Sequence, residues 1–347
     1  MVKRIVQLII FLGIGVFFIW FSIKDLKPQD VEIIRQSAQG IMNTRSLLFI
    51  LSSMGCGALA HYFRALRNIL LINPLGFRVR KTTAFYSVMI CYLANLALPR
   101  LGEVLRCSFL QRYDQVPFQK SFGTVVAERA FDFIIFLILF VLILFINKGL
   151  FAELALSEQL GGWMKDKMEL IWAAKFYVLF IAIALITSFV AYRFLIRKKH
   201  TSSHQNHKQS KMVALFKNIL VGLWQGLISI KDLKKPYLFI VYTISIWVFY
   251  YLGTFLCMFA FDFLQSIGPM PPFVILVIGA ISFMIAQGGL GAYPLFVAGI
   301  LALYGIEYAQ GLAAGWIGWC AQTLMILVVG LITFVLASFL KVENRAY

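Results

Sequence analysis

Charged residues interrupt apolar sequence in two places, and these residues are the strongest candidates for chemistry in the chain. The first group contains Arg100, Glu103 and Arg106, beside Pro99 and Gly102. An ionised side chain inside a membrane segment costs roughly 2.5–3.5 kcal/mol on insertion scales, so it usually faces a partner or a cavity. Guanidinium groups bind phosphate through two parallel hydrogen bonds. The arginines are therefore candidate ligands for a phosphate-bearing head group.

The second charged group lies near the start of an apolar run that extends from about 122 to 146, and consists of Glu128, Arg129 and Asp132. Glu128 and Asp132 are four positions apart, so they share a face of a helix, whereas Arg129 points about 100° away. The three arginines and three carboxylates of the two groups nearly cancel. Two interpretations stay open: a charge-paired lock between segments, or one or two free arginines that grip phosphate. Both can hold, with different residues in each role.

A glycine-rich sequence, Gln287-Gly288-Gly289-Leu290-Gly291, interrupts another apolar run. Glycines of this kind can bring backbone N–H groups close to an anionic head group. The alternative is a flexible turn that allows neighbouring helices to pack tightly. The sequence leaves both interpretations open.

Other chemistries find little support. His200, His204 and His207 lie in a polar loop without acidic or cysteine partners, so we expect no metal site. No Walker loop, nucleophile elbow, zinc-protease motif or dinucleotide fingerprint occurs, and we expect neither a cofactor nor an enzyme. The cysteines show no C-x-x-C spacing and are interpreted as buried thiols: Cys56, Cys91, Cys107, Cys257 and Cys320.

The elements that position these residues must lie in a membrane. Of the 347 residues, 61% are hydrophobic and 14% are charged, whereas soluble domains are about 45–50% apolar and about 25% charged. An all-α polytopic membrane protein is the class that fits. The net charge of +17 is explained by Lys and Arg in cytoplasmic loops, so nucleic acid is not expected as a partner.

Hydropathy predicts six full transmembrane helices, two broken apolar segments and two amphipathic interfacial helices. The six spans are predicted at about 5–23, 46–62, 122–146, 170–196, 237–261 and 311–340. The broken segments, 82–110 and 272–306, are typical of re-entrant hairpins buried in protein or lining a polar cavity. The amphipathic helices are predicted at 24–45 and 213–235, and Arg64 and Arg67 are assigned to a basic loop that extends to Lys81.

Lys and Arg are concentrated in the segments that become cytoplasmic if the N-terminus is inside. The positive-inside rule therefore places both termini and the loop 197–211 in the cytoplasm, and 148–168 outside. The predicted location is the inner (cytoplasmic) membrane.

The single membrane domain, 1–347, divides into halves that match element by element, 1–147 and 170–340. The tips of the two hairpins fall at 100–102 and 289–291 in corresponding positions. Each half has an odd number of crossings, so the halves have opposite orientation. Inverted repeats with paired broken helices are typical of transporters, which bind substrate near the midplane between the breaks.

Three motifs resemble the lysylphosphatidylglycerol synthase transmembrane (flippase-like) family across nearly the whole chain. They are Asn95-x-x-Leu98-Pro99-Arg100-x-Gly102-Glu103-x-x-Arg106, Glu128-Arg129-x-x-Asp132 and Gly288-Gly289-Leu290-Gly291. The resemblance implies a polytopic inner-membrane protein that moves polar lipids between leaflets. The family includes members linked to aminoacylated phosphatidylglycerol, hopanoid and polyprenyl-phosphate glycan pathways.

The chain departs from the family's pattern in two respects. The soluble aminoacyl-transferase domain of full-length synthases is absent from this sequence, so we expect no lipid aminoacylation. Many members carry Pro before the glycines and an acidic residue after them, whereas this chain has Gln287 before them and Tyr293-Pro294 after them. An acidic-residue role at the second hairpin is therefore not expected.

The predicted function is a flippase or scramblase-like transporter of a phosphate-containing phospholipid or polyprenyl-linked lipid. The alternative is a membrane-embedded transferase, or an accessory subunit, in cell-envelope lipid modification. Expected partners are membrane lipids, with a second copy of the chain or an envelope-biosynthesis enzyme as candidate protein partners. The candidate head-group ligands are Arg100, Arg106, Arg129, Asn95, Gly288, Gly289 and Gly291. The candidate structural and charge-network residues are Glu103, Glu128, Asp132, Pro99 and Gly102.

Overall fold

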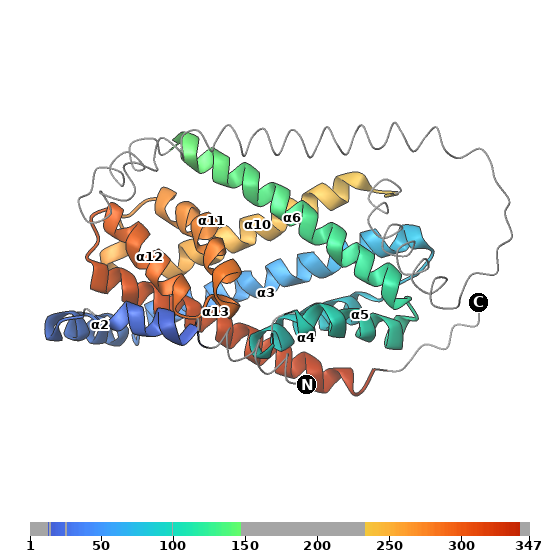
Figure 1. The fold of residues 1–347 in the computed structure, drawn as a ribbon, viewed down its shortest axis with the longest axis horizontal. Helices are drawn as coiled ribbons and strands as arrows, with labels where there is room; N and C mark the ends of the chain where they lie inside the picture. The colour runs from blue at the N-terminus through green and yellow to red at the C-terminus, as the bar shows by residue number, and fades with distance from the viewer. Residues whose placement is uncertain (1–12, 14, 25, 99, 147–232, 341–347) are drawn as a thin grey trace, which may run out of the picture. The chain divides into compact units, whose positions relative to one another are not determined.

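The computed structural model describes residues 13, 15–24, 26–98, 100–146 and 233–340, which contain helices and no strand. The chain divides into two units, 1–137 with 218–347, and 138–217, and the description below concerns the first. Residues 15–23 are helical. The helices that follow are α2 (Pro28–Gly40), α3 (Thr44–Ile72), α4 (Lys81–Ala97), α5 (Leu101–Asp114), α6 (Phe118–Ile146), α10 (Pro236–Phe259), α11 (Met270–Ile285), α12 (Ala292–Leu303) and α13 (Tyr308–Ala337) (Figure 1).

Four of the described helices, α3, α6, α10 and α13, are long and apolar enough to cross a membrane. They have between 24 and 30 residues, and about 20 residues suffice to span the hydrocarbon layer. The predicted class, an all-helical multi-pass membrane protein, is therefore confirmed for this part of the chain. The predicted span 170–196 lies outside the described residues, as does most of 5–23.

The other apolar helices are short and occur in pairs. Helices α4 and α5 have 17 and 14 residues, and α11 and α12 have 16 and 12. At about 1.5 Å per residue, none reaches the ~30 Å of a hydrocarbon core. Helix α4 packs on α5, α11 packs on α12, and α13 packs against both α4 and α12 (Figure 1). The predicted interruptions of both apolar segments are present.

Helices α3 and α10 run side by side and make the most extensive helix contact of the described chain. Ser46 Oγ donates a hydrogen bond to the carbonyl oxygen of Ala260 at 2.7 Å, and Ser53 Oγ donates to that of Gly253 at 2.7 Å. Small residues allow the two helix backbones to approach closely. Hydrogen bonds from hydroxyl groups then help to hold the helices together, because burial of apolar surface does not drive helix association in lipid.

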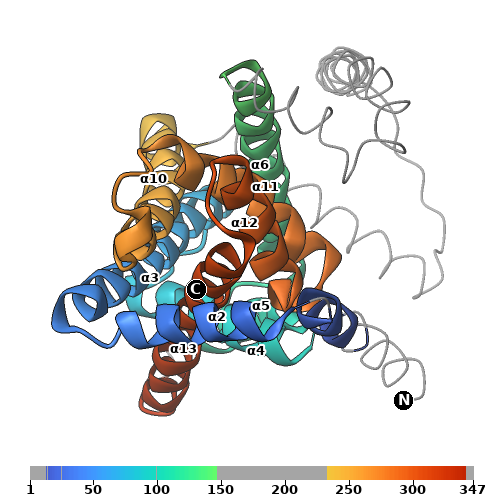
Figure 2. The same cartoon turned by 90° about the vertical axis from the view of Figure 1, so that its left-hand side faces the viewer.

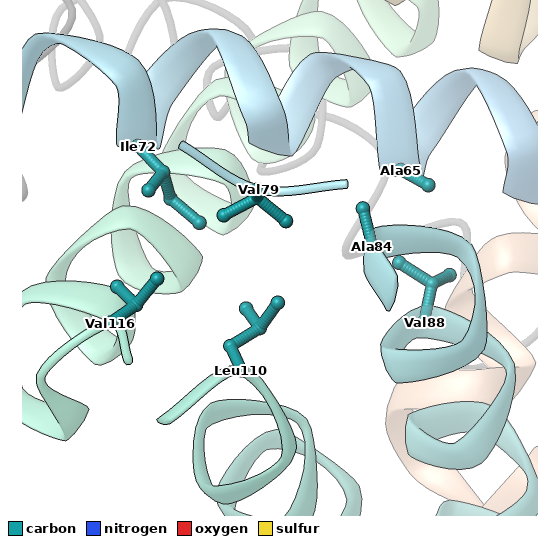
Figure 3. Close-up of a cluster of buried hydrophobic side chains, with 7 residues drawn as sticks. All are labelled: Ala65, Ile72, Val79, Ala84, Val88, Leu110 and Val116. Carbon is teal, nitrogen blue, oxygen red and sulfur yellow. The ribbon is translucent and has the colours of Figure 1, made fainter. Parts of the chain in front are cut away.

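A cluster of buried aliphatic side chains attaches the α4–α5 pair to the C-terminal part of α3 (Figure 3). Its members come from α3, from α4 and the residues before it, and from α5 and the residues after it: Ala65, Ile72, Val79, Ala84, Val88, Leu110 and Val116. The cluster fixes where the break between α4 and α5 lies relative to the long helices.

The assignment of Arg64 and Arg67 to a loop is wrong. Helix α3 continues to Ile72, and both arginines are buried within it. The physical reason is a counterion, because Asp132 of α6 accepts hydrogen bonds from both. Arginines in an apolar sequence suggest a loop when the sequence is read alone, but they can lie in a buried helix when a carboxylate of another helix faces them.

The predicted amphipathic helix at 24–45 is observed as α2, a shorter element without buried residues. Figure 2 shows α2 running across the bundle, where it contacts α13. The second predicted amphipathic helix, 213–235, lies almost entirely outside the described residues, and the loop 197–211 lies wholly outside them.

Candidate functional site

The break between α4 and α5 is produced by Pro99 and its neighbours. Helix α4 ends at Ala97, and Leu98 adopts an extended backbone with φ −139° and ψ 125°. Proline disfavours a helical conformation in the residue before it, so the α4 helix cannot continue. Arg100 then takes a left-handed backbone with φ 65°, and α5 begins at Leu101. Holding a residue other than glycine in that region costs about 1–2 kcal/mol.

Asn95 and Gly102 hold the end of α4 against the start of α5. Asn95 Oδ1 accepts a hydrogen bond from the backbone N–H of Gly102 at 2.8 Å, which satisfies a donor of the first turn of α5. Asn95 Nδ2 lies 3.3 Å from a carboxylate oxygen of Glu103. A Cβ at Gly102 would overlap the carbonyl oxygen of Cys91. Both residues therefore have a structural task at the break, although Asn95 was predicted as a head-group ligand.

Arg106 forms a buried ion pair with Glu128. Its two terminal nitrogens donate to the carboxylate oxygens at 2.9 and 3.2 Å. The side chains are only 3% and 1% exposed. A pair this deeply buried has little access to a lipid head group, so Arg106 lies where the lock interpretation places it. Its role as a phosphate ligand stays a prediction.

Arg129 does not pair with its neighbour Glu128 but with Glu103 on α5, at 3.0 Å. This pair is far more open, with side chains 44% exposed for Arg129 and 21% for Glu103. One carboxylate occupies only part of a guanidinium, which has five N–H donors. Arg129 can therefore offer further donors to a ligand without breaking its pair.

Asp132 lies at the midpoint of α6 (Phe118–Ile146), and it bridges two arginines of α3. Arg64 donates to one carboxylate oxygen at 2.6 Å and Arg67 donates to the other at 2.7 Å. Sequence reasoning missed both arginines, because α3 was ended too early. The signal that could have found them is their i, i+3 spacing, which places them on one helix face together with His61 and Asn68.

Arg100 differs from the other arginines of the site. Its side chain is exposed, and its guanidinium has neither a hydrogen bond nor an ion pair among the residues that the structure describes. It lies at the N-cap of α5, where the helix dipole adds a partial positive charge. Arg100 and Arg129 are the exposed arginines of this site.

The second break, between α11 and α12, meets the first. Gln287 Nε2 lies 3.3 Å from the carbonyl oxygen of Asn95 and 3.2 Å from that of Leu96, and donates to both. Trp319 Nε1 on α13 donates to the carbonyl oxygen of Gly288 at 2.7 Å. The end of α4 and the turn Gln287–Gly289 that follows α11, far apart in sequence, are thus in direct contact.

The glycines of the second break are used mainly for conformation and packing. Gly288, Gly289 and Gly291 have φ of 61°, 69° and 70°, values that favour glycine. A Cβ at Gly291 would lie 2.6 Å from the backbone nitrogen of Ile19, so the N-terminal helical residues pack directly on this break. Gly288 has more room, since its nearest neighbour would be Leu96 Cδ2 at 3.8 Å. Of the three, it fits a ligand-facing role best.

Among the described residues, no group of three or more His, Cys, Asp or Glu could hold a metal ion. The histidines at 200, 204 and 207 lie outside these residues. His61 is buried in α3 and packs on Tyr92, with ring centroids 4.1 Å apart. The chemistry available at the two breaks is therefore ionic and hydrogen-bonding.

The comparisons with known proteins agree with this picture. A protein-family model described as "Lysylphosphatidylglycerol synthase TM region" matches residues 2–330. The match includes both breaks and all of α3, α6 and α10. No curated protein and no solved structure matches the chain.

Proposed function

The chain belongs to the family of lysylphosphatidylglycerol synthase transmembrane regions, and from that premise we propose that it is a flippase or scramblase-like transporter. The family makes it a membrane protein of lipid modification or lipid transport. The finer proposal is that a polar, phosphate-bearing head group crosses the membrane at the two helix breaks while the apolar tail stays in lipid. The observation that carries it is Arg100, an exposed cation on an interrupted apolar segment.

The order of elements supports an inverted repeat with halves 1–147 and 170–340. A long helix, a broken pair and another long helix occur as α3, α4–α5 and α6, and again as α10, α11–α12 and α13. Transporters built from such repeats bind substrate near the midplane, beside discontinuous helices. The contact of Gln287 with the end of α4 supports a site shared by both breaks.

The charged residues divide into two roles in this proposal. Arg106 with Glu128, and Arg64 and Arg67 with Asp132, form a lock that holds α3, α5 and α6 together. Arg100 and Arg129 contact the phosphate, because they are the exposed arginines of the site. Glu103 positions Arg129.

This division favours a transporter over a membrane-embedded transferase. General-base chemistry needs a carboxylate or another base that is available to the substrate. Glu103, Glu128 and Asp132 each accept hydrogen bonds from arginine. An inner-membrane location with both termini in the cytoplasm belongs to the same proposal, on the basis of the positive charge of the predicted cytoplasmic segments.

The test is leaflet transfer of a fluorescent phospholipid in liposomes that contain the purified chain. Arg100→Gly removes the guanidinium and suits the left-handed backbone, so the break should stay intact. We expect transfer to fall about tenfold or more, because a hydrogen bond to a charged group contributes ~1.5–3 kcal/mol.

Arg112→Gly is the matched control for lost charge, since Arg112 is also exposed and lies at the other end of α5. It should keep the transfer rate of the unmodified chain, provided that circular dichroism shows retained helix. Equal rates for the unmodified chain and folded Arg100→Gly protein would contradict the proposed role of this residue. No transfer above that of empty liposomes would contradict transport itself.

A further inference from the structure

We infer that the head group taken by this site is net anionic, and that lipids whose head group carries a compensating cationic group are disfavoured. The inference rests on the proposed function and narrows its substrate class. It comes from an imbalance of charge in the apolar part of the chain, where arginines outnumber carboxylates.

Carboxylates are scarce in the apolar segments of the entire sequence. The chain has 15 Asp and Glu residues, and neither 1–24 nor 170–231 contains one. Three carboxylates lie near the first break: Glu103 in the first turn of α5, and Glu128 and Asp132 in the interior of α6. Asp114 is the last residue of α5 and pairs with Arg80 at 2.9 Å. Among the described residues, few carboxylates are therefore available to balance the arginines of the site.

Arginines exceed these three carboxylates. Four arginines, Arg64, Arg67, Arg106 and Arg129, hydrogen-bond to them, and one carboxylate serves two of the four. Arg100 adds a further positive charge at the break. Excess charge in a low-dielectric region attracts a counterion strongly, because desolvation is otherwise uncompensated. With five arginines and three carboxylates, the described site carries a net positive charge.

The positive charge that a lipid can reach belongs to Arg100 and Arg129. Arg64, Arg67 and Arg106 have side chains that are 7%, 0% and 3% exposed, against 44% for Arg129. Glu103 is the accessible carboxylate here, but Arg129 and Asn95 already donate to it. An anionic group thus meets the exposed guanidinium of Arg100 and the remaining N–H donors of Arg129, whereas an ammonium group meets Glu103, which already accepts from both Arg129 and Asn95.

The chemical class that fits is a lipid with a phosphate ester and no amine, such as phosphatidylglycerol. An aminoacylated phosphatidylglycerol carries the same phosphate with added ammonium groups, so it is a probe of charge at nearly constant structure. Phosphatidylethanolamine, which is zwitterionic, should fall between them.

The experiment measures competitive lipid binding to the purified full chain by native mass spectrometry. Equal amounts of phosphatidylglycerol, phosphatidylethanolamine and lysylphosphatidylglycerol are offered. We expect retention in that order, with about a tenfold difference between the first and the last, the effect of roughly one charge-assisted hydrogen bond. Equal retention of the three lipids, or preference for the lysylated lipid, would overturn the inference.

Two variants with opposite expected signs separate charge recognition from folding. Glu103→Gln frees Arg129 and should increase the preference for phosphatidylglycerol. Arg129→Gln frees Glu103 and should move the preference toward the lysylated lipid, whereas Arg129→Lys should keep it. Arg35→Gln, on surface helix α2, removes the same charge outside the two breaks and should change nothing. A purely structural role for the pair would weaken retention of all lipids in both glutamine variants, and that result would also overturn the inference.

The same samples distinguish the failure of this inference from the failure of transport. Transfer of all three lipids at one rate, with equal retention, would refute the charge preference and leave transport standing. Retention in the expected order without any leaflet transfer would refute transport and leave the charge preference standing.

Discussion

The two helix breaks have similar architecture but different chemistry. Between α4 and α5 the break is held by polar and charged side chains, with Asn95 bonding to the N–H of Gly102 and Glu103 pairing with Arg129. Between α11 and α12 the break has three glycines with positive φ, neutral side-chain hydrogen bonds from Gln287 and Trp319, and no charged residue from 287 to 294.

This difference indicates that the two breaks have different roles. Buried ion pairs are rigid and specific, and removing one partner is costly, so the first break is well suited to hold a cation in a defined place. A glycine-rich break allows close approach of other backbones, as Gly291 does for Ile19. We therefore expect the first break to recognise the head group. We expect the second to allow close helix packing and to change its backbone angles at a small cost in free energy.

The largest effect that would test this comparison is the loss of Glu128. Glu128→Ala leaves Arg106 without its carboxylate in a site that is 3% exposed, and we expect a loss of about 3–5 kcal/mol in stability. The measurement is thermal unfolding in detergent, together with the yield of folded protein. No single substitution of a polar residue at the second break should cost as much.

A double variant provides the control for this prediction. Replacing both partners, as in Arg106→Met with Glu128→Leu, removes the uncompensated charge and should recover most of the stability. An unchanged melting temperature for Glu128→Ala would show that the pair does not lock the first break. Failure of the double variant to recover stability would mean that α5 and α6 depend on the charges themselves.

The sequence predicted the broken helices well because the breaks have local causes. Proline at 99 and glycines at 288, 289 and 291 act on their own backbone and their immediate neighbours, so the interruptions could be placed from composition alone. The long helices were predicted for the same reason, since about 20 consecutive apolar residues suffice to indicate a span.

The pairing of charges could not be predicted, because it depends on which helix faces meet. Arg64 and Arg67 look like loop residues until Asp132, 65 or more positions away, is brought against them. Glu128 and Arg129 are adjacent in sequence yet pair with different residues of α5. Such contacts are set by tertiary packing, to which hydropathy and residue spacing give no direct access.

A smaller effect is expected from adding a methyl group at each break. Gly102→Ala would force its Cβ into the carbonyl oxygen of Cys91, and overpacking of this kind costs about 1–3 kcal/mol or more. A Cβ at Gly288 would make only an ordinary contact with Leu96 at 3.8 Å, but the residue must keep φ 61°, so we expect Gly288→Ala to cost about 1–2 kcal/mol. Thermal unfolding of the two variants, with Gly55→Ala in α3 as the unhindered control, measures the difference. A larger loss at Gly288 than at Gly102 would reverse the comparison, and the second break would then be the rigid one.

The smallest effect is expected at the link between the breaks. Gln287 Nε2 donates to the carbonyl oxygens of Asn95 and Leu96 at 3.3 and 3.2 Å, both rather long hydrogen bonds. Gln287→Leu should therefore cost only ~0.5–1.5 kcal/mol. If the second break serves as a pivot, this link restrains it, and its removal should change the lipid transfer rate more than the melting temperature.

Gln287→Glu tests whether the two breaks share one site for an anionic head group. It replaces a donor with a carboxylate beside two carbonyl oxygens, and it adds negative charge next to the end of α4. Because Arg100 lies in the turn that follows, the added carboxylate should compete with an anionic head group and lower its retention. Thermal unfolding, leaflet transfer and lipid retention, measured together on both variants, separate the two effects. If Gln287→Glu retained anionic lipid as well as Gln287→Leu does, the two breaks would not share one site.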